Sequence, residues 1–473
     1  MINSKKEKKI GIGLFGKGST NHLHRHEIVK DFVDKGFRIS FIVRDDYFDL
    51  LNKIDGCEYH PCKVIQESGW RASILRACQN IRRLYPAKDI KQLRVHQARN
   101  APQEKRPWSP IYLWINRLAA KYRICAAIAV RIEDWLFRPC LVQGIDATQY
   151  DLLILLGIGT VHSELEGVVT RWAGHHQLPC LHVIGNYDHV SSKGFRGITP
   201  NILLVWGPQM LEDAVAYQGI AFPRIQVVGS LRYNSINKEK LQERSFFLKS
   251  IGLEPDANTI VFAGHAYASQ YFEVLAMYLD LLASGERCQI ILRLYPNKTF
   301  MNSVYIEPLI YYAKSLPRTY LSFADPYYKY GYTDKEVLQV EEDELWNSLN
   351  SCDVLVEYYS TIALEGAIFD KPIIHMHYLP QTAQPYVKKP IQFPTWDQIH
   401  NRRILVSGAV QVAHTRQELM TSIQESFRNP GKLAEQRKKL IDSECGPLDG
   451  MASDRLLHAC SQVLHDIQRR DIN

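Results

Sequence analysis

The sequence contains no apolar stretch long enough to span a membrane. Its longest apolar run is residues 152–158, whereas a spanning helix needs ~20 such residues. Four lysines lie among the first nine residues, but the apolar segment that follows is short and broken by glycines, unlike a signal peptide. We therefore expect a cytoplasmic protein, either free or held peripherally on the inner face of the membrane.

Grouped metal ligands are also missing. The ten cysteines are scattered, and the Cys-x-x-His-x-Cys run at residues 57–62 has no second Cys/His pair at a zinc-ligand distance. His22, His24 and His26 alternate in sequence, which places no two of them one helical turn apart. No Asp-x-Asp pair ends a predicted strand. The sequence thus predicts no metal site and no cofactor, and it favours reduced, mostly buried thiols.

Charge is unevenly distributed. The net charge of +7 is too small to indicate nucleic-acid binding, yet Arg71–Arg138 contains fifteen Lys/Arg and four Asp/Glu. Its latter part, Tyr112–Phe137, lacks Gly and Pro and predicts one long helix. Trp108, Trp114 and Trp135 accompany the bases. Two interpretations stay open: a surface for anionic lipid headgroups or an anionic acceptor, or an ordinary amphipathic helix with a solvated basic face.

The rest of the chain alternates short apolar runs with helical-period segments, and neither repeats nor low-complexity tracts interrupt it. This rhythm is typical of βαβ units and parallel sheets. The predicted strands are Lys9–Phe15, Arg38–Val43, Tyr150–Leu156, Cys180–Ile184, Ile202–Trp206, Ile225–Val228, Thr259–Phe262, Gln289–Arg293, Asp353–Tyr358 and Pro372–His377. They predict an α/β protein with two Rossmann-like, doubly wound domains facing across a cleft, the arrangement called GT-B.

The domain boundary is expected where a polar, charged segment, Asn234–Arg244, follows the last strand of the first half. We predict an N-terminal acceptor domain over 1–233, with the basic helical insertion at about 71–138. A C-terminal nucleotide-sugar domain covers 234–450. A final helix over 451–473 packs back on the first domain.

The strongest local signal is a strand, a hydroxyl pair and a helix within residues 353–374. Ser360 and Thr361 fall where the helix begins, and helix N-termini bind phosphate. Plain N-capping is the alternative, but a capping box would need its acid three residues after the cap. Glu365 comes four residues after Thr361, on the same face, where its carboxylate could accept hydrogen bonds from a ribose diol. The motif predicts nucleotide binding.

Three further residues follow strands of the second half. Gly264 would let a backbone approach a ligand closely, and His265 would point into the crevice at the strand end. Arg293 ends the next strand and could bind a diphosphate in bidentate fashion. The alternatives are a surface histidine and a structural ion pair. Glu357 is unusual at the end of a buried strand, and its role is left open.

In the first half, Gly16 and Lys17 follow the first strand. Their spacing does not match a phosphate-binding P-loop, so we interpret them as a glycine-rich turn lining the acceptor side.

The candidate general bases lie later in the first half. Asp188 and His189 follow the strand Cys180–Ile184, and either could deprotonate an acceptor hydroxyl. Lys193 could bind the leaving diphosphate or an anionic acceptor. His162 and Glu164 are weaker candidates for the base, and a polar turn held by local hydrogen bonds is the structural alternative.

Several of these blocks resemble a family of bacterial GT-B glycosyltransferase-like proteins related to CDP-glycerol glycerophosphotransferases and capsule-type glycosyltransferases. The similar segments are Gly185–Gly194, Val205–Gln209, Arg224–Gly229, Arg293–Pro296, Ser360–Pro372 and Asp449–Arg455. The resemblance implies a donor nucleotide bound by Arg293, Ser360, Thr361 and Glu365, with the acceptor on the side of Asp188. In the glycerophosphotransferases a histidine tied to the chemistry stands where this chain has Tyr295, so the departure favours sugar transfer.

Together these features predict a metal-independent glycosyltransferase that uses a nucleotide-sugar, with a UDP-type donor favoured, and a glycan or lipid-linked glycan as acceptor. The rivals are a nucleotide-sugar epimerase of the same fold, a CDP-glycerol-type glycerophosphotransferase, and a non-catalytic nucleotide- or carbohydrate-binding protein. Nucleic acid is not an expected partner.

Overall fold

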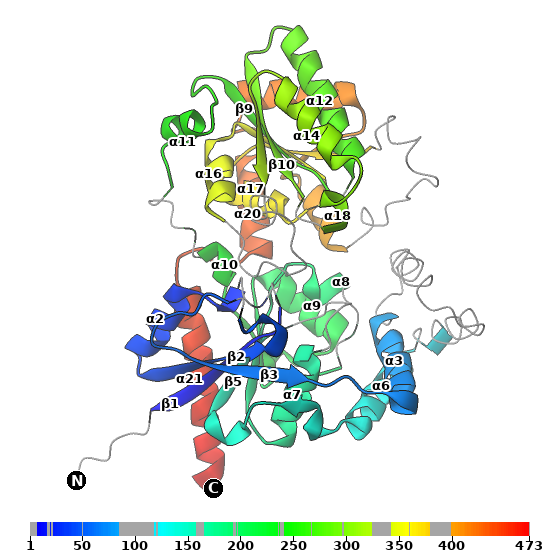
Figure 1. Cartoon of the computed structure of the whole chain (residues 1–473), viewed down its shortest axis with the longest axis vertical. Helices are drawn as coiled ribbons and strands as arrows, with labels where there is room; N and C mark the ends of the chain where they lie inside the picture. The colour runs from blue at the N-terminus through cyan, green and yellow to red at the C-terminus, as the bar shows by residue number, and fades with distance from the viewer. Residues whose placement is uncertain are drawn as a thin grey trace. The chain divides into compact units, whose positions relative to one another are not determined.

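The computed structural model describes residues 7–16, 19, 22–49, 51–84, 118–119, 122–157, 165–192, 195, 197–234, 236, 241–265, 267–295, 298–323, 342–358, 360–378 and 399–472. The chain forms two compact units (Figure 1). Unit 1 comprises Met1–Ser235, Asp397–His400 and Ser443–Asn473. Unit 2 comprises Ile236–Trp396 and Asn401–Asp442. The second unit is therefore inserted in the sequence of the first.

Unit 1 is built on an eight-stranded sheet of order β4-β3-β2-β1-β5-β6-β7-β8. The strands are β1 (Lys8–Leu14), β2 (Phe37–Arg44), β3 (Glu58–Val64), β4 (Val142–Gln143), β5 (Leu152–Leu156), β6 (Cys180–Val183), β7 (Ile202–Val205) and β8 (Ile225–Val227). Every pairing is parallel except that of β3 with β4. The strand order reverses between β1 and β5, as in doubly wound folds.

The helices of unit 1 cover a sheet whose central strands are apolar on both faces. β5 and β6 are buried throughout, as parallel strands between two helical layers must be. The helices are α2 (His26–Asp34), α3 (Gly69–Leu84), α6 (Arg123–Leu136), α7 (Leu165–His175), α8 (His189–Ser192), α9 (Pro208–Gln218), α10 (Leu231–Asn234) and α21 (Ala452–Ile472). Short 3₁₀ turns lie at Asp45–Tyr47, Pro139–Leu141, Ala147–Gln149 and Phe222–Arg224.

Unit 2 contains a six-stranded, all-parallel sheet of order β11-β10-β9-β12-β13-β14. The strands are β9 (Asn258–Ala263), β10 (Cys288–Leu294), β11 (Thr319–Phe323), β12 (Val354–Glu357), β13 (Ile373–Met376) and β14 (Gln411–Ala413). This is the strand order of a Rossmann domain, with its reversal between β9 and β12.

Two helical layers enclose this second sheet. The helices in this part of the chain are α11 (Arg244–Ser250), α12 (Ala268–Ala283), α13 (Lys298–Met301), α14 (Ile306–Ser315), α16 (Asp343–Ser351), α17 (Ile362–Ile368), α18 (Ile399–Val406), α19 (Arg416–Arg428) and α20 (Ala434–Glu444). Residues of α12, α14 and α19 share one core with alternate residues of the strands. Figure 1 shows α16 and α17 on the other side of the sheet from α12 and α14.

The predicted fold class is confirmed: both domains are Rossmann-like, and α21 packs in unit 1 against α2, α10 and β7. One prediction is wrong. Tyr112–Phe137 does not form one uninterrupted helix, because Tyr122 has an extended backbone (φ −112°, ψ 126°) and α6 begins only at Arg123. Residues 112–117 of that prediction lie outside the described residues.

Candidate functional site

The carboxyl ends of the unit 2 strands bring charged side chains into one row. Residues facing one another in a parallel ladder point to the same face of the sheet. Here the ladder aligns one residue from each of the six strands. The row runs Ser322, Arg293, Ala263, Glu357, His375 and Val412. It crosses the β9/β12 reversal, the place where open α/β sheets bind ligands.

This row faces α17 and not the main apolar core. The neighbouring residues Leu292, Leu294 and Val356 point into the core formed with α12, α14 and α19, so Arg293 and Glu357 alternate to the opposite face. That face is covered by α16 and α17. The row is thus the polar end of an otherwise apolar sheet surface.

Glu357 and His375 form a buried pair at the centre of the row. Glu357 Oε1 lies 2.5 Å from His375 Nδ1, and both side chains are almost fully excluded from water. The second carboxylate oxygen, Oε2, accepts a hydrogen bond of 3.1 Å from the backbone N–H of Ser360. One carboxylate therefore fixes both the imidazole of β13 and the start of the loop into α17. Burying such a carboxylate is tolerable because its oxygens are hydrogen-bonded.

Arg293 supplies the positive charge of the row. Its side chain is buried, and Nη1 donates a hydrogen bond of 2.9 Å to Ser322 Oγ on β11. The guanidinium is thereby held near the strand ends in a fixed orientation. A planar group with several donors is suited to diphosphate oxygens.

Ser360, Thr361 and Glu365 lie where the sequence predicts, at the start of α17 and one turn into it. Thr361 is the N-cap and makes no side-chain capping hydrogen bond to the helix, whereas Ser360 Oγ accepts a hydrogen bond of 3.5 Å from Ile362 N at the start of the helix. Glu365 is buried. α17 has only seven residues, and its dipole is correspondingly short.

Gly366, next to Glu365, sets how closely α17 approaches the sheet. A Cβ at this position would lie 2.5 Å from Leu355 Cδ2. Only glycine allows such contact, so the helix carrying Glu365 lies tightly against β12.

The turn after β9 holds the other predicted donor residues. A Cβ on Gly264 would come within 2.9 Å of Tyr271 Cζ, so the space beside this glycine is filled by a packed aromatic ring. The ring of His265 stacks on Tyr295, with centroids 4.7 Å apart and planes at 22°. Tyr295 N in turn donates to Tyr271 Oη at 2.9 Å. The tyrosine that replaces the expected histidine thus supports His265.

A second histidine, His377, comes directly after β13. Partial burial, with smaller contributions from His375 and His414, lowers the pKa of His377 to about 4. Its ring centroid lies 6.0 Å from that of His375 and 5.1 Å from that of His414. Because its pKa is so low, His377 is neutral at pH 7.

In unit 1, Asp188 and His189 lie just beyond β6, at the carboxyl end of the first sheet. His189 Nε2 is 4.0 Å from Asp188 Oδ1. His189 N donates a hydrogen bond of 3.1 Å to Asn186 O, which fixes the turn that carries both side chains. The structure therefore keeps the two predicted bases side by side.

His22 joins this group, although the sequence considered it only as a metal ligand. Burial, followed by the charges of Arg232, Arg25 and His189, lowers the pKa of His22 well below its usual value. Its ring lies 6.3 Å from that of Trp206, at the end of β7. This grouping could not be recognised from the sequence, because residues 22, 189 and 232 are separated by more than 40 positions in the chain.

The turn at Gly16 is closed by a serine. Ser19 Oγ accepts hydrogen bonds from Phe15 N (2.9 Å) and Gly16 N (3.1 Å) and donates one to Gly16 O (2.8 Å). Those two amides already have a partner within the turn, which speaks against a phosphate-binding loop at this point. Lys17, Lys193, His162 and Glu164 lie outside the described residues.

Comparison with known proteins gives structural matches only. No protein-family model and no curated protein matches the sequence. A Listeria monocytogenes protein named as a candidate UDP-N-acetylglucosamine 2-epimerase matches with a TM-score of 0.53 at 10% identity, over 98% of both chains. The UDP-GlcNAc 2-epimerase of Neisseria meningitidis, bound to UDP-GlcNAc, matches with 0.52 at 9%, over 96% of this chain and 100% of that one. MnaA of S. aureus, solved with UDP, matches with 0.51 at 10%, over 97% of both.

At identities near 10% these matches show the fold alone. The chain is a GT-B protein with two Rossmann-like domains, and its structural neighbours include enzymes of nucleotide-sugar metabolism. Which reaction this chain performs has to be argued from its own residues.

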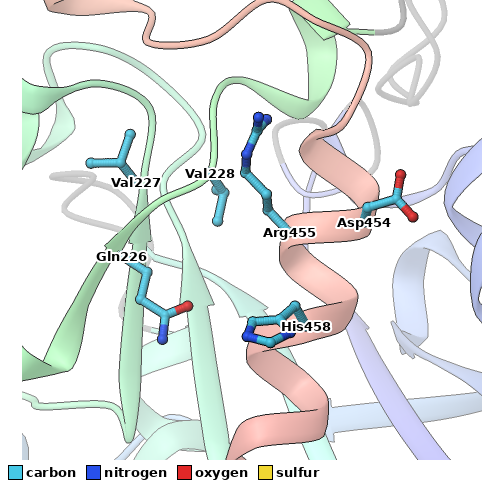
Figure 2. A pocket seen from close by; sticks show the side chains of 6 residues that line it. All are labelled: Gln226, Val227, Val228, Asp454, Arg455 and His458. Carbon is cyan, nitrogen blue, oxygen red and sulfur yellow. The ribbon is translucent and has the colours of Figure 1, made fainter.

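An open pocket elsewhere in unit 1 contains none of the predicted site residues. It lies between β8 and α21 and is lined by Gln226, Val227, Val228, Asp454, Arg455 and His458. Figure 2 shows His458 extending from α21 toward Gln226. Asp449 pairs with Arg455 at the start of α21, and this pairing lowers the pKa of Asp449 to about 2. The late Asp-Gly-Met-Ala-Ser-Asp-Arg motif therefore has a structural role in starting that helix.

Within the described residues, no three His, Cys, Asp or Glu side chains are grouped so as to hold a metal ion. In the same part of the chain, no helix combines the length and the apolar character needed to cross a bilayer.

Proposed function

We propose that this protein is a metal-independent glycosyltransferase whose nucleotide-sugar donor binds at the carboxyl ends of the unit 2 strands. The observation that carries the proposal is the buried row formed by Arg293, Glu357 and His375 beside the Ser360–Thr361 turn. A fixed guanidinium, two hydroxyls and a helix-borne carboxylate match the needs of a diphosphate linked to a ribose.

We infer the reaction from the chemistry of these side chains. An acceptor hydroxyl attacks the anomeric carbon of the donor sugar, and the bond between that carbon and the diphosphate oxygen breaks. Asp188, or His189 beside it, takes the hydroxyl proton. Arg293 and the hydroxyls of Ser360 and Thr361 stabilise the charge that develops on the leaving nucleoside diphosphate, a form of preorganised electrostatic catalysis. Glu365 accepts hydrogen bonds from the ribose diol.

A UDP-type donor is favoured because two of the structural neighbours contain UDP or UDP-GlcNAc. The acceptor is a glycan or a lipid-linked glycan. The resemblance to capsule-type transferases supports this choice, and Tyr295 in place of the expected histidine argues against glycerol phosphate transfer.

The experiment is a thermal-shift screen of nucleotides and nucleotide-sugars against the wild type and Glu365→Ala. At a ligand concentration near 100 times Kd, binding stabilises a protein by about 2.7 kcal/mol, enough to raise Tm by several degrees. We expect a UDP-type ligand to raise Tm of the wild type and to lose most of this effect with Glu365→Ala. Glu435→Ala, which removes an exposed acid from the first turn of α20, should respond like the wild type.

If no nucleotide raises Tm of the wild type, the donor site is wrongly assigned. If nucleotides bind but the protein neither transfers, hydrolyses nor epimerises the donor, it is a non-catalytic binder.

An epimerase is the second candidate, and the structural neighbours named above favour it. It shares the donor site and differs in needing no acceptor. Incubation with UDP-GlcNAc alone separates the two: appearance of the C2 epimer supports the epimerase, whereas an unchanged donor that is consumed only when acceptor is added supports the transferase.

A further inference from the structure

The outward face of α6 is apolar where a surface helix is usually polar. Ala126, Ala129 and Leu136 are buried against the protein. On the other side, Ile124, Ile128 and Trp135 are 68%, 48% and 79% exposed. Positions i, i+4 and i+11 fall within about 60° around a helix axis. The three side chains therefore form one stripe about 16 Å long on the face that amphipathic helices normally turn to water.

Arginines accompany this stripe. Arg131 is exposed on α6 between Ile128 and Trp135. α3 contributes an exposed tryptophan, Trp70, whose ring lies 5.3 Å from the guanidinium of Arg71. Figure 1 shows α3 and α6 side by side, and the two helices pack against each other. Aromatic rings and arginines together are typical of surfaces that meet lipid headgroups.

The acidic side chains of this region form ion pairs with arginines of the same unit. Glu133 binds Arg82 and Arg171, each at 2.6 Å, and Asp134 binds Arg171 at 2.7 Å. These are the two acids of α6, and α3 contains none. Glu133 is buried, and Asp134, whose side chain is 55% exposed, is paired with Arg171, so the arginines of the outward face keep their positive field.

The same ion pairs hold the face rigidly. Arg82 comes from α3, Glu133 from α6 and Arg171 from α7, and Arg82 and Glu133 are buried. A buried pair of this kind is costly to break. The stripe is consequently presented on a fixed platform of three helices.

We propose that the exposed stripe of α6 (Ile124, Ile128, Arg131 and Trp135), with Trp70 and Arg71 on the neighbouring helix α3, binds the surface of an anionic lipid bilayer; together these six residues are called the α3/α6 face. The apolar side chains would enter the interfacial layer while the arginines contact lipid phosphates. An exposed apolar patch requires a partner that buries it, and the positive field requires that partner to be negative. Each basic residue near such a membrane strengthens binding by about fivefold.

A second copy of this chain fits the face less well. A symmetric dimer would bring the same positively charged face of two chains together, and repulsion between like charges would oppose the burial of the apolar stripe. A bilayer containing anionic lipid meets both requirements at once.

The test is co-sedimentation of the full chain with vesicles of phosphatidylcholine alone and of phosphatidylcholine with phosphatidylglycerol at 3:1, at low and at high salt. We expect the anionic vesicles to bind at least about tenfold more tightly, with the preference reduced as salt rises. Ile128→Ser/Trp135→Ser should weaken this binding by about tenfold or more, and so should Arg131→Glu.

The matched control is Val304→Ser/Tyr311→Ser, which removes one aliphatic and one aromatic side chain, each 81% exposed, from unit 2. It should bind vesicles like the wild type, and thermal melting should show that both double variants remain folded. No binding of the wild type to anionic vesicles, or equal binding of Ile128→Ser/Trp135→Ser, would overturn the proposal. Self-association without lipid that disappears with the same variant would assign the face to a second copy. The vesicles contain neither nucleotide nor glycan, so the result is independent of the proposed transferase activity.

Discussion

The polar groups at the carboxyl ends of the strands differ between the two sheets. In unit 2 the strand ends present charged groups locked by hydrogen bonds: Arg293 on Ser322, and Glu357 on His375. In unit 1 the corresponding end gathers His22, Asp188 and His189, and burial together with nearby arginines holds the pKa of His22 well below its usual value.

In the proposed mechanism this difference corresponds to two tasks, donor binding and proton acceptance. Fixed charges bind a charged ligand, because they pay no reorganisation when charge develops on it. Neutral imidazole and nearby carboxylate accept protons. In the proposed mechanism the strand ends of unit 2 bind the donor and those of unit 1 accept the proton, so substitutions at the two places should affect different measurements.

The largest effect is expected from Asp188→Asn. If Asp188 accepts the acceptor's proton, the amide should reduce the rate of transfer by about 10²- to 10⁴-fold, while the affinity for the donor nucleotide stays as in the wild type. Initial rates of nucleoside diphosphate release, with Kd measured by calorimetry, separate the two quantities.

His189→Gln is the comparison for that variant. If His189 is the base, His189→Gln should lose activity and Asp188→Asn should retain it. A loss of donor affinity with either variant would contradict the division of tasks between the strand ends of the two units.

A smaller effect, on stability, is expected from Glu357→Gln. The substitution leaves His375 and the Ser360 amide without their carboxylate partner, and an imperfectly satisfied buried polar group costs about 1–3 kcal/mol. Urea unfolding of the full chain should show this as a lower midpoint. Glu254→Gln makes the same chemical change in an exposed ion pair with Arg287 and should alter stability by less than about 1 kcal/mol. Equal midpoints for the two variants would contradict the role given to the buried pair.

The smallest effect is a loss of stability in mild acid. Burial, the main cause in both cases, lowers the pKa of His24 and of His377 to about 4. The unfolded chain, with an ordinary histidine pKa near 6.5, binds protons more readily than the native state between those values. Stability should therefore fall as pH drops from about 6.5 to about 4. Replacement of His24 and His377 by Gln should flatten the dependence of Tm on pH in that window; an unchanged slope would show that other groups control it.

The central strands could be predicted from sequence because they are buried on both faces and form continuous apolar runs. β5, with Leu152–Leu156, is the clearest case. The missed strands lie at or near sheet edges: β3, which contains Pro61, and the terminal strands β4, β11 and β14. A terminal strand has ladder partners on one side only, and β3 pairs on its outer side with just the two-residue strand β4, so these sequences need not be apolar and proline is tolerated.

The site could be predicted only in part, because register is a property of pairs of strands. Arg293, Ser360 and Glu365 follow recognisable strand and helix signals. His375 lies inside the apolar run Ile373–Met376, and nothing local indicates that it faces Glu357, 18 residues away. Likewise, Arg232 approaches His22 only through the order of the strands.

The placement of α21 in unit 1 has a consequence for biosynthesis. Unit 2 occupies a continuous stretch of the chain apart from four residues near 400, whereas unit 1 needs Ser443–Asn473 to cover its sheet. During translation, which proceeds at about 5–20 residues per second, the domain that emerges first from the ribosome must wait for the last residues before it is complete. Unit 2 can finish folding sooner, so a chain released early would carry a finished second domain attached to an unfinished first one.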